Sequence, residues 1–159
     1  MTRPFRVLPV AYEGPGCFGD FLWMREQPEY DRALFVFNDN ESQFEAFESG
    51  RPSGFTPGGG NAAIRPWRGE NPPRAAGIPT GDRGGYPQLD ERVLGVIGRA
   101  LDVVADLVDG GWYDTVVFSG DQRTERLGAS IFSPHPDVLH YVYRMLIGIA
   151  PGSPRAWTS

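Results

Sequence analysis

The chain has 159 residues, 40% hydrophobic and 13% aromatic, which fits a single domain with enough apolar side chains for a core. Its net charge is −5, and all of its positively charged side chains at pH 7 are arginines, because the sequence contains no lysine. The lack of lysine excludes P-loop and Schiff-base chemistry. The acidic balance argues against direct nucleic-acid binding.

In the first half of the chain, residues 5–12 are predicted to be extended, with Pro9 at a sheet edge or a bend. A glycine-rich turn follows over residues 13–20. Residues 33–37 form a short apolar run, typical of a buried strand. A short helix is expected over 41–49, a helix that stops near Pro66 over 61–67, and a strand over 74–79.

The second half contains the longest predicted helix, residues 88–109, whose apolar positions recur at spacings of three and four. Residues 114–118 predict a strand, and Pro136 and Asp137 open a final helix over 136–148. We expect residues 1–150 to form the domain and residues 151–159 a loose tail.

Strands that alternate with helices indicate an α/β fold. We therefore expect one three-layer domain, in which helices flank a mixed, largely parallel central sheet. Ligands of such sheets bind at the carboxyl ends of the strands. Two of these ends carry small, polar, turn-forming residues and are the first candidates for a site. They are Asn38, Asp39 and Asn40 after the first buried strand, and Ser119, Gly120 and Asp121, with Gly128 further on, after the last. An Asx-turn and an ordinary strand-to-helix turn would explain them equally well.

The sharpest motif is a glycine triplet, Gly58-Gly59-Gly60, followed by Asn61 and the predicted start of a helix. Glycines expose their backbone N–H groups, and a helix N-terminus adds a positive dipole end. A diphosphate is the natural ligand of such a loop. The alternative is a flexible loop without a ligand.

Three large side chains follow the triplet. Arg65 and Arg68 could donate charge-assisted hydrogen bonds to a phosphate, or they could be a surface arginine pair. Trp67 is the tryptophan best placed in the sequence to stack on a base.

Metal and nucleophile chemistry have weaker support. The single cysteine, Cys17, can form neither an internal disulfide nor a cysteine zinc cage. His135 and His140 lack neighbouring ligands, so we expect no metal. A triad of Ser119, His135 and Asp121 would lack the glycines of a nucleophile elbow. Without a membrane-length apolar run or a secretory leader, a cytoplasmic protein is expected.

The combination of these motifs resembles the macrodomain family, the ADP-ribose-binding domains of the Appr-1''-p processing type. Family members read V-N-A-A-N after a strand and then G-G-G-V-x-x-A-I. Here Phe37-Asn38-Asp39-Asn40 is followed by Gly58-Gly59-Gly60-Asn61-Ala62-Ala63-Ile64. The later Ser119-Gly120 resembles the family's second phosphate loop. Phe35 to Asn40 is also similar to phage-type relatives that read F-V-F-G-D-N. The resemblance covers roughly residues 33–147.

The resemblance implies a site for ADP-ribose or a related nucleotide, with no cofactor. Asn40 would face the distal ribose, Gly58 to Gly60 would lie against that ribose and the diphosphate, and Ser119 to Asp121 would close over the phosphates. It also implies an ADP-ribosylated macromolecule as a partner. The protein would then be a reader or a hydrolase of ADP-ribosyl groups. The alternative is a non-enzymatic interaction protein that uses the same fold without a ligand.

The chain also departs from the family pattern. Ala62 and Ala63 stand where some hydrolytic members carry an acid. The acid that holds adenine in the family has only Glu13 and Asp20 as candidates. These departures favour binding over hydrolysis and leave the catalytic residues unassigned.

Overall fold

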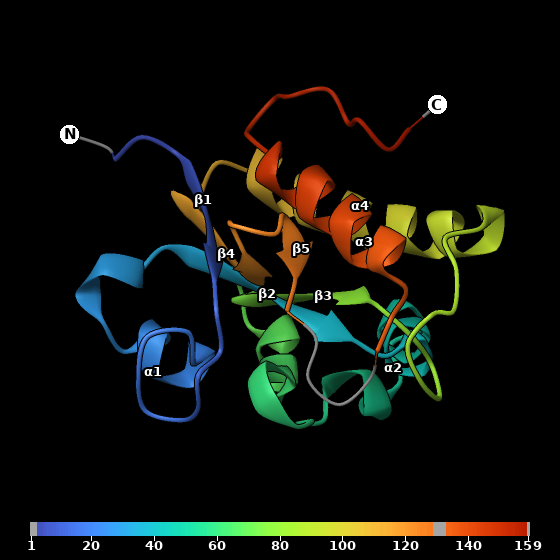
Figure 1. Cartoon of the computed structure of the whole chain (residues 1–159). Coiled ribbons are helices and arrows are strands. Elements are labelled where there is room, and N and C mark those ends of the chain that lie inside the picture. The colour runs from blue at the N-terminus through green and yellow to red at the C-terminus, as the bar shows by residue number, and fades with distance from the viewer. Residues whose placement is uncertain (1–2, 129–132, 159) are drawn as a thin grey trace.

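Four parallel strands form the centre of the molecule, in the order β1 (Arg6–Val10), β4 (Thr115–Asp121), β2 (Ala33–Asp39) and β3 (Ala75–Pro79) (Figure 1). A short fifth strand, β5 (Arg126–Leu127), pairs antiparallel with β4. The computed structural model describes residues 3–128 and 133–158. The chain is thus an α/β domain with a mostly parallel five-stranded sheet flanked by helices, as the sequence predicts.

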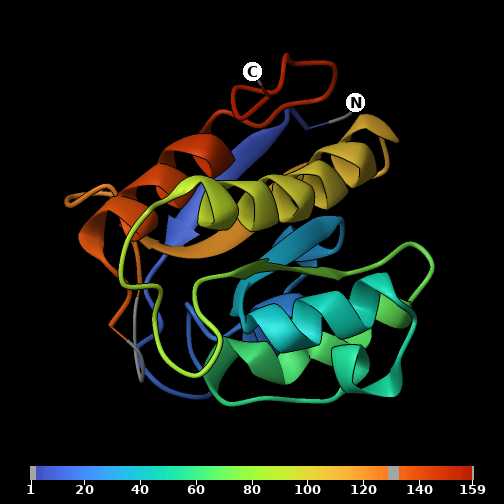
Figure 2. The ribbon, with the colours of Figure 1, turned by 90° about the vertical axis from the view of Figure 1, so that its right-hand side faces the viewer.

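Helices cover both faces of this sheet (Figures 1 and 2). The helices α3 (Glu91–Asp109) and α4 (Pro136–Ile147) lie on one face. The other face carries α1 (Phe21–Arg25) and two 3₁₀ helices, η1 (Pro28–Tyr30) and η3 (Gly60–Gly69). Within the described residues, no helix is long and apolar enough to cross a membrane.

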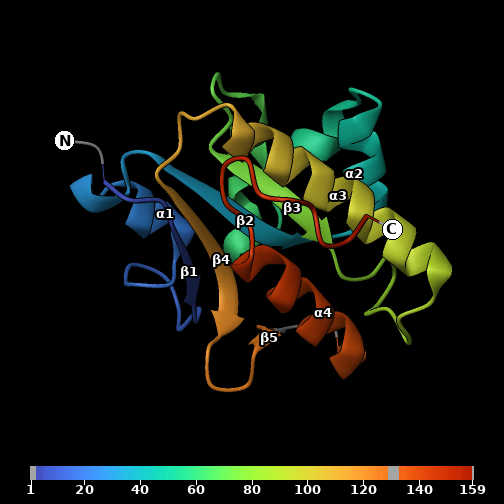
Figure 3. The ribbon, with the colours of Figure 1, turned by 90° about the horizontal axis from the view of Figure 1, so that it is seen from above.

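The helix α2 (Glu41–Glu48) follows β2 and lies next to α3, near the β3 edge of the sheet (Figure 3). Two ion pairs join these helices, Arg92 to Glu41 and Arg99 to Glu48, each at 3.0 Å. The 3₁₀ helix η2 (Pro52–Phe55) connects α2 to the glycine triplet. The segment before the triplet is therefore anchored to the sheet edge.

The core has two layers because successive side chains of β2 point to opposite faces of the sheet. Leu34 and Val36 pack under α3 and α4, whereas Phe35 and Phe37 pack against α1 and η3. All four side chains are buried. A parallel sheet covered on both faces needs such a continuous apolar run, and this is why residues 33–37 lack polar alternation.

The two strongest predicted strands are confirmed as buried neighbours, because Val36 of β2 pairs with Phe118 of β4. The long helix begins at Glu91, later than predicted, because Asp90 caps it by accepting a hydrogen bond from the Val93 amide at 2.9 Å. The predicted stop of the helix near Pro66 is wrong. The segment forms a 3₁₀ helix that continues through Pro66 to Gly69.

The C-terminal residues contact α3. The Arg155 guanidinium pairs with Asp102 at 3.0 Å and also with Asp106, and the Trp157 indole N–H donates to Asp102 at 3.0 Å. The Trp157 ring packs against the apolar cluster under α3 and α4. These contacts fasten residues 155–157, for which the sequence indicates a loose tail, to the outer side of α3.

An ion pair joins α1 to the end of η3 and makes the stability of the protein depend on pH. The Arg25 guanidinium donates two hydrogen bonds of 2.6 Å to the Glu70 carboxylate and lies 4.4 Å from the Trp67 ring centre. These hydrogen bonds hold the pKa of Glu70 below its ordinary value. The pair therefore stabilises the fold above the unfolded pKa of about 4.3, and this contribution is lost as the pH falls through the lower folded pKa.

We expect the free energy of unfolding to fall between about pH 5 and about pH 3, and to fall less steeply in a Glu70→Gln variant. Urea titrations across this range measure both slopes. Equal slopes in the two proteins would mean that the pair contributes nothing to acid sensitivity.

Candidate functional site

A cavity of about 530 Å³ opens where β1, β4 and β2 end and η3 begins. The carboxyl ends of parallel strands lie at one edge of a sheet, so residues distant in sequence meet there. The lining consists of small and polar side chains with one aromatic ring. Its residues are Ala11, Tyr12, Asn38, Gly59, Gly60, Asn61, Ala62, Ser119, Gly120, Asp121 and Gly128.

Most of the residues predicted for the site line this cavity: Asn38, Gly59, Gly60, Asn61, Ser119, Gly120, Asp121 and Gly128. The structure thus brings both polar strand ends and the glycine triplet to one place. Asp39, Asn40, Gly58 and Arg65 lie outside this lining. Each of these four makes specific contacts with the protein itself.

The glycine loop combines open space with an unusual backbone. Gly59 is exposed, and a Cβ built on it would meet no atom within 4 Å. Gly60 has a φ of +54°, in the left-handed region that favours glycine. A hydrogen bond of 3.0 Å from the Gly58 amide to the Ala62 carbonyl closes the loop. The loop can therefore bring its backbone close to a ligand.

Asn61, one of the lining residues, connects three segments through its side-chain hydrogen bonds. Its amide nitrogen donates to the Gly19 carbonyl at 2.9 Å and to Ser119 Oγ at 3.1 Å. Its amide oxygen accepts from the Phe21 N–H at 2.9 Å. The glycine loop, the segment after β1 and the end of β4 are thereby held in a fixed arrangement.

The side of the cavity formed by β2 and β4 is also closed by hydrogen bonds. The Asn38 amide nitrogen donates to the Gly128 carbonyl at 2.6 Å, and the Gly128 N–H donates to the Ser119 carbonyl at 3.2 Å. The Asp121 carboxylate accepts from the Arg123 N–H at 2.8 Å, which forms an Asx-turn. Among the described residues that line the cavity, Asp121 is the one carboxylate.

Behind the glycine loop lies a buried ionic cluster of Asp39, Arg65 and Arg68, with side-chain exposures of 0%, 7% and 1%. Arg65 donates to one oxygen of Asp39 at 3.1 and 3.2 Å, and Arg68 donates to the other oxygen. The interpretation of the arginines as a surface pair is therefore wrong. Neither arginine lines the cavity, so the structure gives no direct support to their phosphate contact either.

The two arginines also fix the segment that leads into the triplet. Arg65 donates to the Thr56 carbonyl at 3.1 Å, and Arg68 donates to the Gly54 carbonyl at 3.0 Å. Burial lowers the pKa of the Arg68 guanidinium, and the charge of Asp39 acts in the opposite direction. The Arg68 guanidinium remains protonated in spite of its burial.

Three other candidates have structural roles. Asn40 caps α2 by accepting from the Ser42 N–H at 2.9 Å, and its amide nitrogen donates to the Asp82 carbonyl. Asp20 is buried and caps α1 by accepting from the Leu22 N–H at 3.1 Å. Trp67 packs on Phe35 at a centroid distance of 5.9 Å, away from the cavity. The hypothesis that Trp67 stacks on a base therefore has no geometric support.

Tyr12 lines the cavity but was not among the residues predicted from the sequence. The residue is 43% exposed, and it lies two positions after Val10, the last residue of β1. The end of the first strand lacks the run of small polar residues that marks the ends of β2 and β4. The signal that indicates Tyr12 is its position just beyond the carboxyl end of β1.

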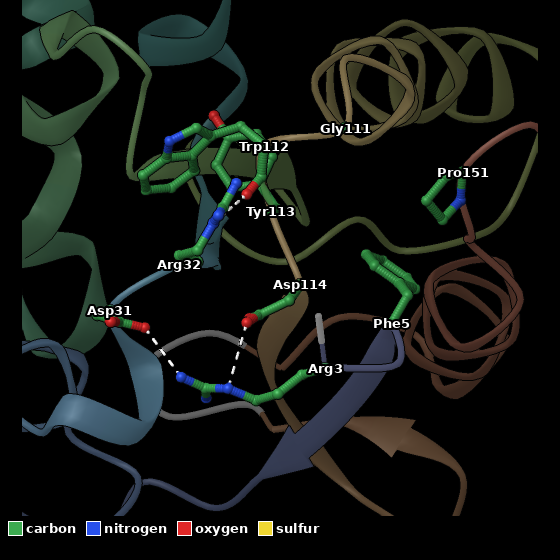
Figure 4. A pocket seen from close by; sticks show the side chains of 9 residues that line it. All are labelled: Arg3, Phe5, Asp31, Arg32, Gly111, Trp112, Tyr113, Asp114 and Pro151. Carbon is green, nitrogen blue, oxygen red and sulfur yellow. Dashed lines mark hydrogen bonds and ion pairs between the residues drawn. The ribbon is translucent and has the colours of Figure 1, made fainter. Parts of the chain in front are cut away.

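A second cavity, of about 450 Å³, lies at the opposite edge of the sheet, where the strands begin (Figure 4). Arg3 bridges Asp31 at 3.1 Å and Asp114 at 3.5 Å across one side of this cavity. Arg32 lies 5.1 Å from the ring centre of Trp112. Because Arg3 already pairs the two carboxylates, and because the glycine triplet lies at the first cavity, the first cavity is the stronger candidate. In the described ranges, 3–128 and 133–158, no cluster of side chains suited to a metal ion occurs.

Comparisons of the chain with family models, with curated proteins and with solved structures find no match. The function of the protein is therefore inferred from the geometry of the cavity and from the sequence motifs.

Asn38 and Asn40 provide a test of which strand-end amide serves the cavity. We expect Asn38→Ala to weaken ligand binding by about tenfold, because Asn38 lines the cavity and holds Gly128. Asn40→Ala should lower the free energy of unfolding by about 1 kcal/mol through loss of the α2 cap, with little effect on binding. Calorimetric titration and urea unfolding of both variants measure these effects. The reverse pattern would assign the ligand contact to Asn40.

Proposed function

We propose that the protein binds ADP-ribose or a related nucleotide diphosphate in the cavity at the carboxyl ends of β1, β4 and β2. The observation that carries the proposal is the convergence of the glycine triplet with two polar strand ends on one cavity of about 530 Å³. Small-molecule sites typically have volumes of about 300–1,000 Å³. The resemblance of the same segments to macrodomain motifs supports this ligand class.

The chemistry of the lining suits the parts of such a ligand. Backbone N–H groups of a glycine loop favour phosphate oxygens. Hydroxyl and amide side chains, here Ser119 and Asn38, suit the hydroxyls of a ribose. Tyr12 supplies an aromatic face on which a base can stack.

Binding of an ADP-ribosyl group attached to a macromolecule is the activity we favour over hydrolysis. Asp121 is the one carboxylate that the described part of the chain contributes to the lining, and it is already engaged in a turn. A reader function needs affinity alone. A hydrolase additionally needs a group placed to activate water.

In agreement with the composition, we also propose that the protein acts in the cytoplasm.

A second candidate function is an interaction module without a small ligand. Three large apolar side chains near α1 are exposed: Tyr12 at 43%, Phe18 at 50% and Leu22 at 48%. An exposed apolar patch is typical of protein contacts, and this second function requires the three side chains to form one. The two functions are separated by whether the cavity binds a nucleotide.

Calorimetric titration and thermal unfolding with ADP-ribose, ADP and NAD test the proposal. We expect ADP-ribose to bind with a dissociation constant in the micromolar range, about −8 kcal/mol. A ligand at about 100 times its dissociation constant should add ~2.7 kcal/mol to the free energy of unfolding. Absence of heat and of any thermal shift at millimolar ligand would favour the interaction module.

A further inference from the structure

The buried cluster behind the glycine loop carries unequal charges. Two guanidinium groups, Arg65 and Arg68, face a single carboxylate, Asp39. The three formal charges therefore leave one positive charge in excess. Within the described residues, the buried Arg68 Nε atom has no hydrogen-bond partner, so this N–H group of the guanidinium is not satisfied inside the cluster.

The cluster adjoins the cavity at two points. Asp39 follows Asn38, which lines the cavity, along β2. Arg65 Nη1 lies 2.7 Å from the position that a Cβ of Gly58 would occupy, directly before the lining residues Gly59 and Gly60. A charge shielded from water keeps its effect over a longer distance than a charge on the surface.

We propose that the Asp39–Arg65–Arg68 cluster makes the glycine-loop cavity selective for negatively charged ligands, with Arg68 supplying the excess charge without touching the ligand. The inference rests on the proposed function and adds the source of its charge selectivity. Arg68 is thus a positioning and specificity residue. The cluster also explains how the cavity can accept a diphosphate although its described lining residues include a carboxylate and no arginine.

The test uses the full chain and compares the binding of neutral and anionic ligands by the parent and by variants with altered charge in the cluster. Adenosine is the neutral probe, and ADP-ribose and inorganic pyrophosphate are the anionic probes. Arg68→Met removes the excess charge and keeps an apolar side chain beside Phe37 and Phe47, whose ring centres lie 5.0 and 4.6 Å from the guanidinium. We expect Arg68→Met to weaken both anions about tenfold and to leave adenosine unchanged.

Two controls separate charge from structure. Arg99→Met changes the net charge by the same amount at a half-exposed position and should leave all affinities unchanged. The double variant Asp39→Asn with Arg68→Met restores the excess charge through Arg65 and should regain most of the affinity for the anions. If the double variant binds them as weakly as Arg68→Met, the effect is structural and the inference is overturned.

A measurement on the unaltered protein keeps the inference testable even where a variant does not fold. Attraction from buried charges is screened much less by salt than attraction from exposed ones. We therefore expect the affinity for pyrophosphate to change less than about threefold between about 50 and about 300 mM salt. A steeper loss would assign the selectivity to exposed arginines.

The outcomes also separate this inference from the proposed function. Binding of pyrophosphate, weakened by Arg68→Met, without binding of ADP-ribose would support the cluster and overturn the nucleotide proposal. Binding of ADP-ribose that is indifferent to Arg68→Met would support the nucleotide proposal and overturn the cluster. Failure of the unaltered protein to bind either anion would overturn both.

Discussion

Gly59→Val is expected to abolish ADP-ribose binding, by at least about 100-fold, while the protein remains folded. Gly59 lines the cavity, and a valine side chain would occupy the place of the phosphate oxygens. Each N–H donor turned away from a charged acceptor costs about 1.5–3 kcal/mol, so the loss of two donors suffices for this effect.

The fold should tolerate Gly59→Val because both the backbone conformation of Gly59 and the space around it accept a side chain. Gly59 has a φ of −78° and a ψ of 160°, which is extended backbone open to any residue. Apart from Gly59 itself and its two chain neighbours, no atom of the described residues lies within 4 Å of its Cβ position. Strain would arise instead at Gly60, whose φ is positive. Gly59 is therefore the triplet position that separates ligand binding from stability.

The measurement pairs calorimetric titration with circular dichroism. Gly84→Val is a matched control, because a Cβ on Gly84 also meets no atom within 4 Å and Gly84 lies outside the cavity lining. We expect the control to bind ADP-ribose like the parent. A folded Gly59→Val protein with the parent's affinity would mean that the glycine loop is not the phosphate site.

The layout of the fold could be predicted from the sequence because its main signals are local. The apolar run 33–37 and the spacing of apolar residues in α3 each reflect burial of one element. Pro66 misled the prediction because a proline terminates an α-helix more often than it fits inside one. The 3₁₀ form that accommodates it depends on contacts of η3 with the sheet.

The candidate site could be predicted in part, for a different reason. The position of Asn38 and Ser119 at strand ends identifies them, because the topology of a parallel sheet brings the carboxyl ends of its strands together where ligands bind. The partners of Arg65 and Arg68 could not be predicted, because the pairing with Asp39 spans 26 and 29 positions. The bridging role of Asn61 likewise depends on Gly19, 42 positions away. Long-range polar pairing leaves no periodic trace in a sequence.

Asp39→Asn is expected to destabilise the protein more than any substitution at its surface, by about 3–5 kcal/mol. The asparagine keeps the shape of the side chain but leaves Arg65 and Arg68 as two buried cations without a counter-charge. Removal of one partner from a buried ion pair is costly, because the remaining charges cannot be solvated by water. Typical domains have a free energy of unfolding of about 5–15 kcal/mol, so this loss is a large fraction of the total.

Urea unfolding of Asp39→Asn beside Glu48→Gln measures this effect against a matched control. Glu48 pairs with Arg99, and their side chains are 32% and 50% exposed. Exposed pairs contribute only about 0–1 kcal/mol, so Glu48→Gln should be close to neutral. Addition of Arg68→Met to Asp39→Asn removes one of the two uncompensated cations and should recover part of the lost stability. A loss below about 1 kcal/mol in Asp39→Asn would contradict the structure of the cluster, because two buried guanidinium groups would then not depend on Asp39.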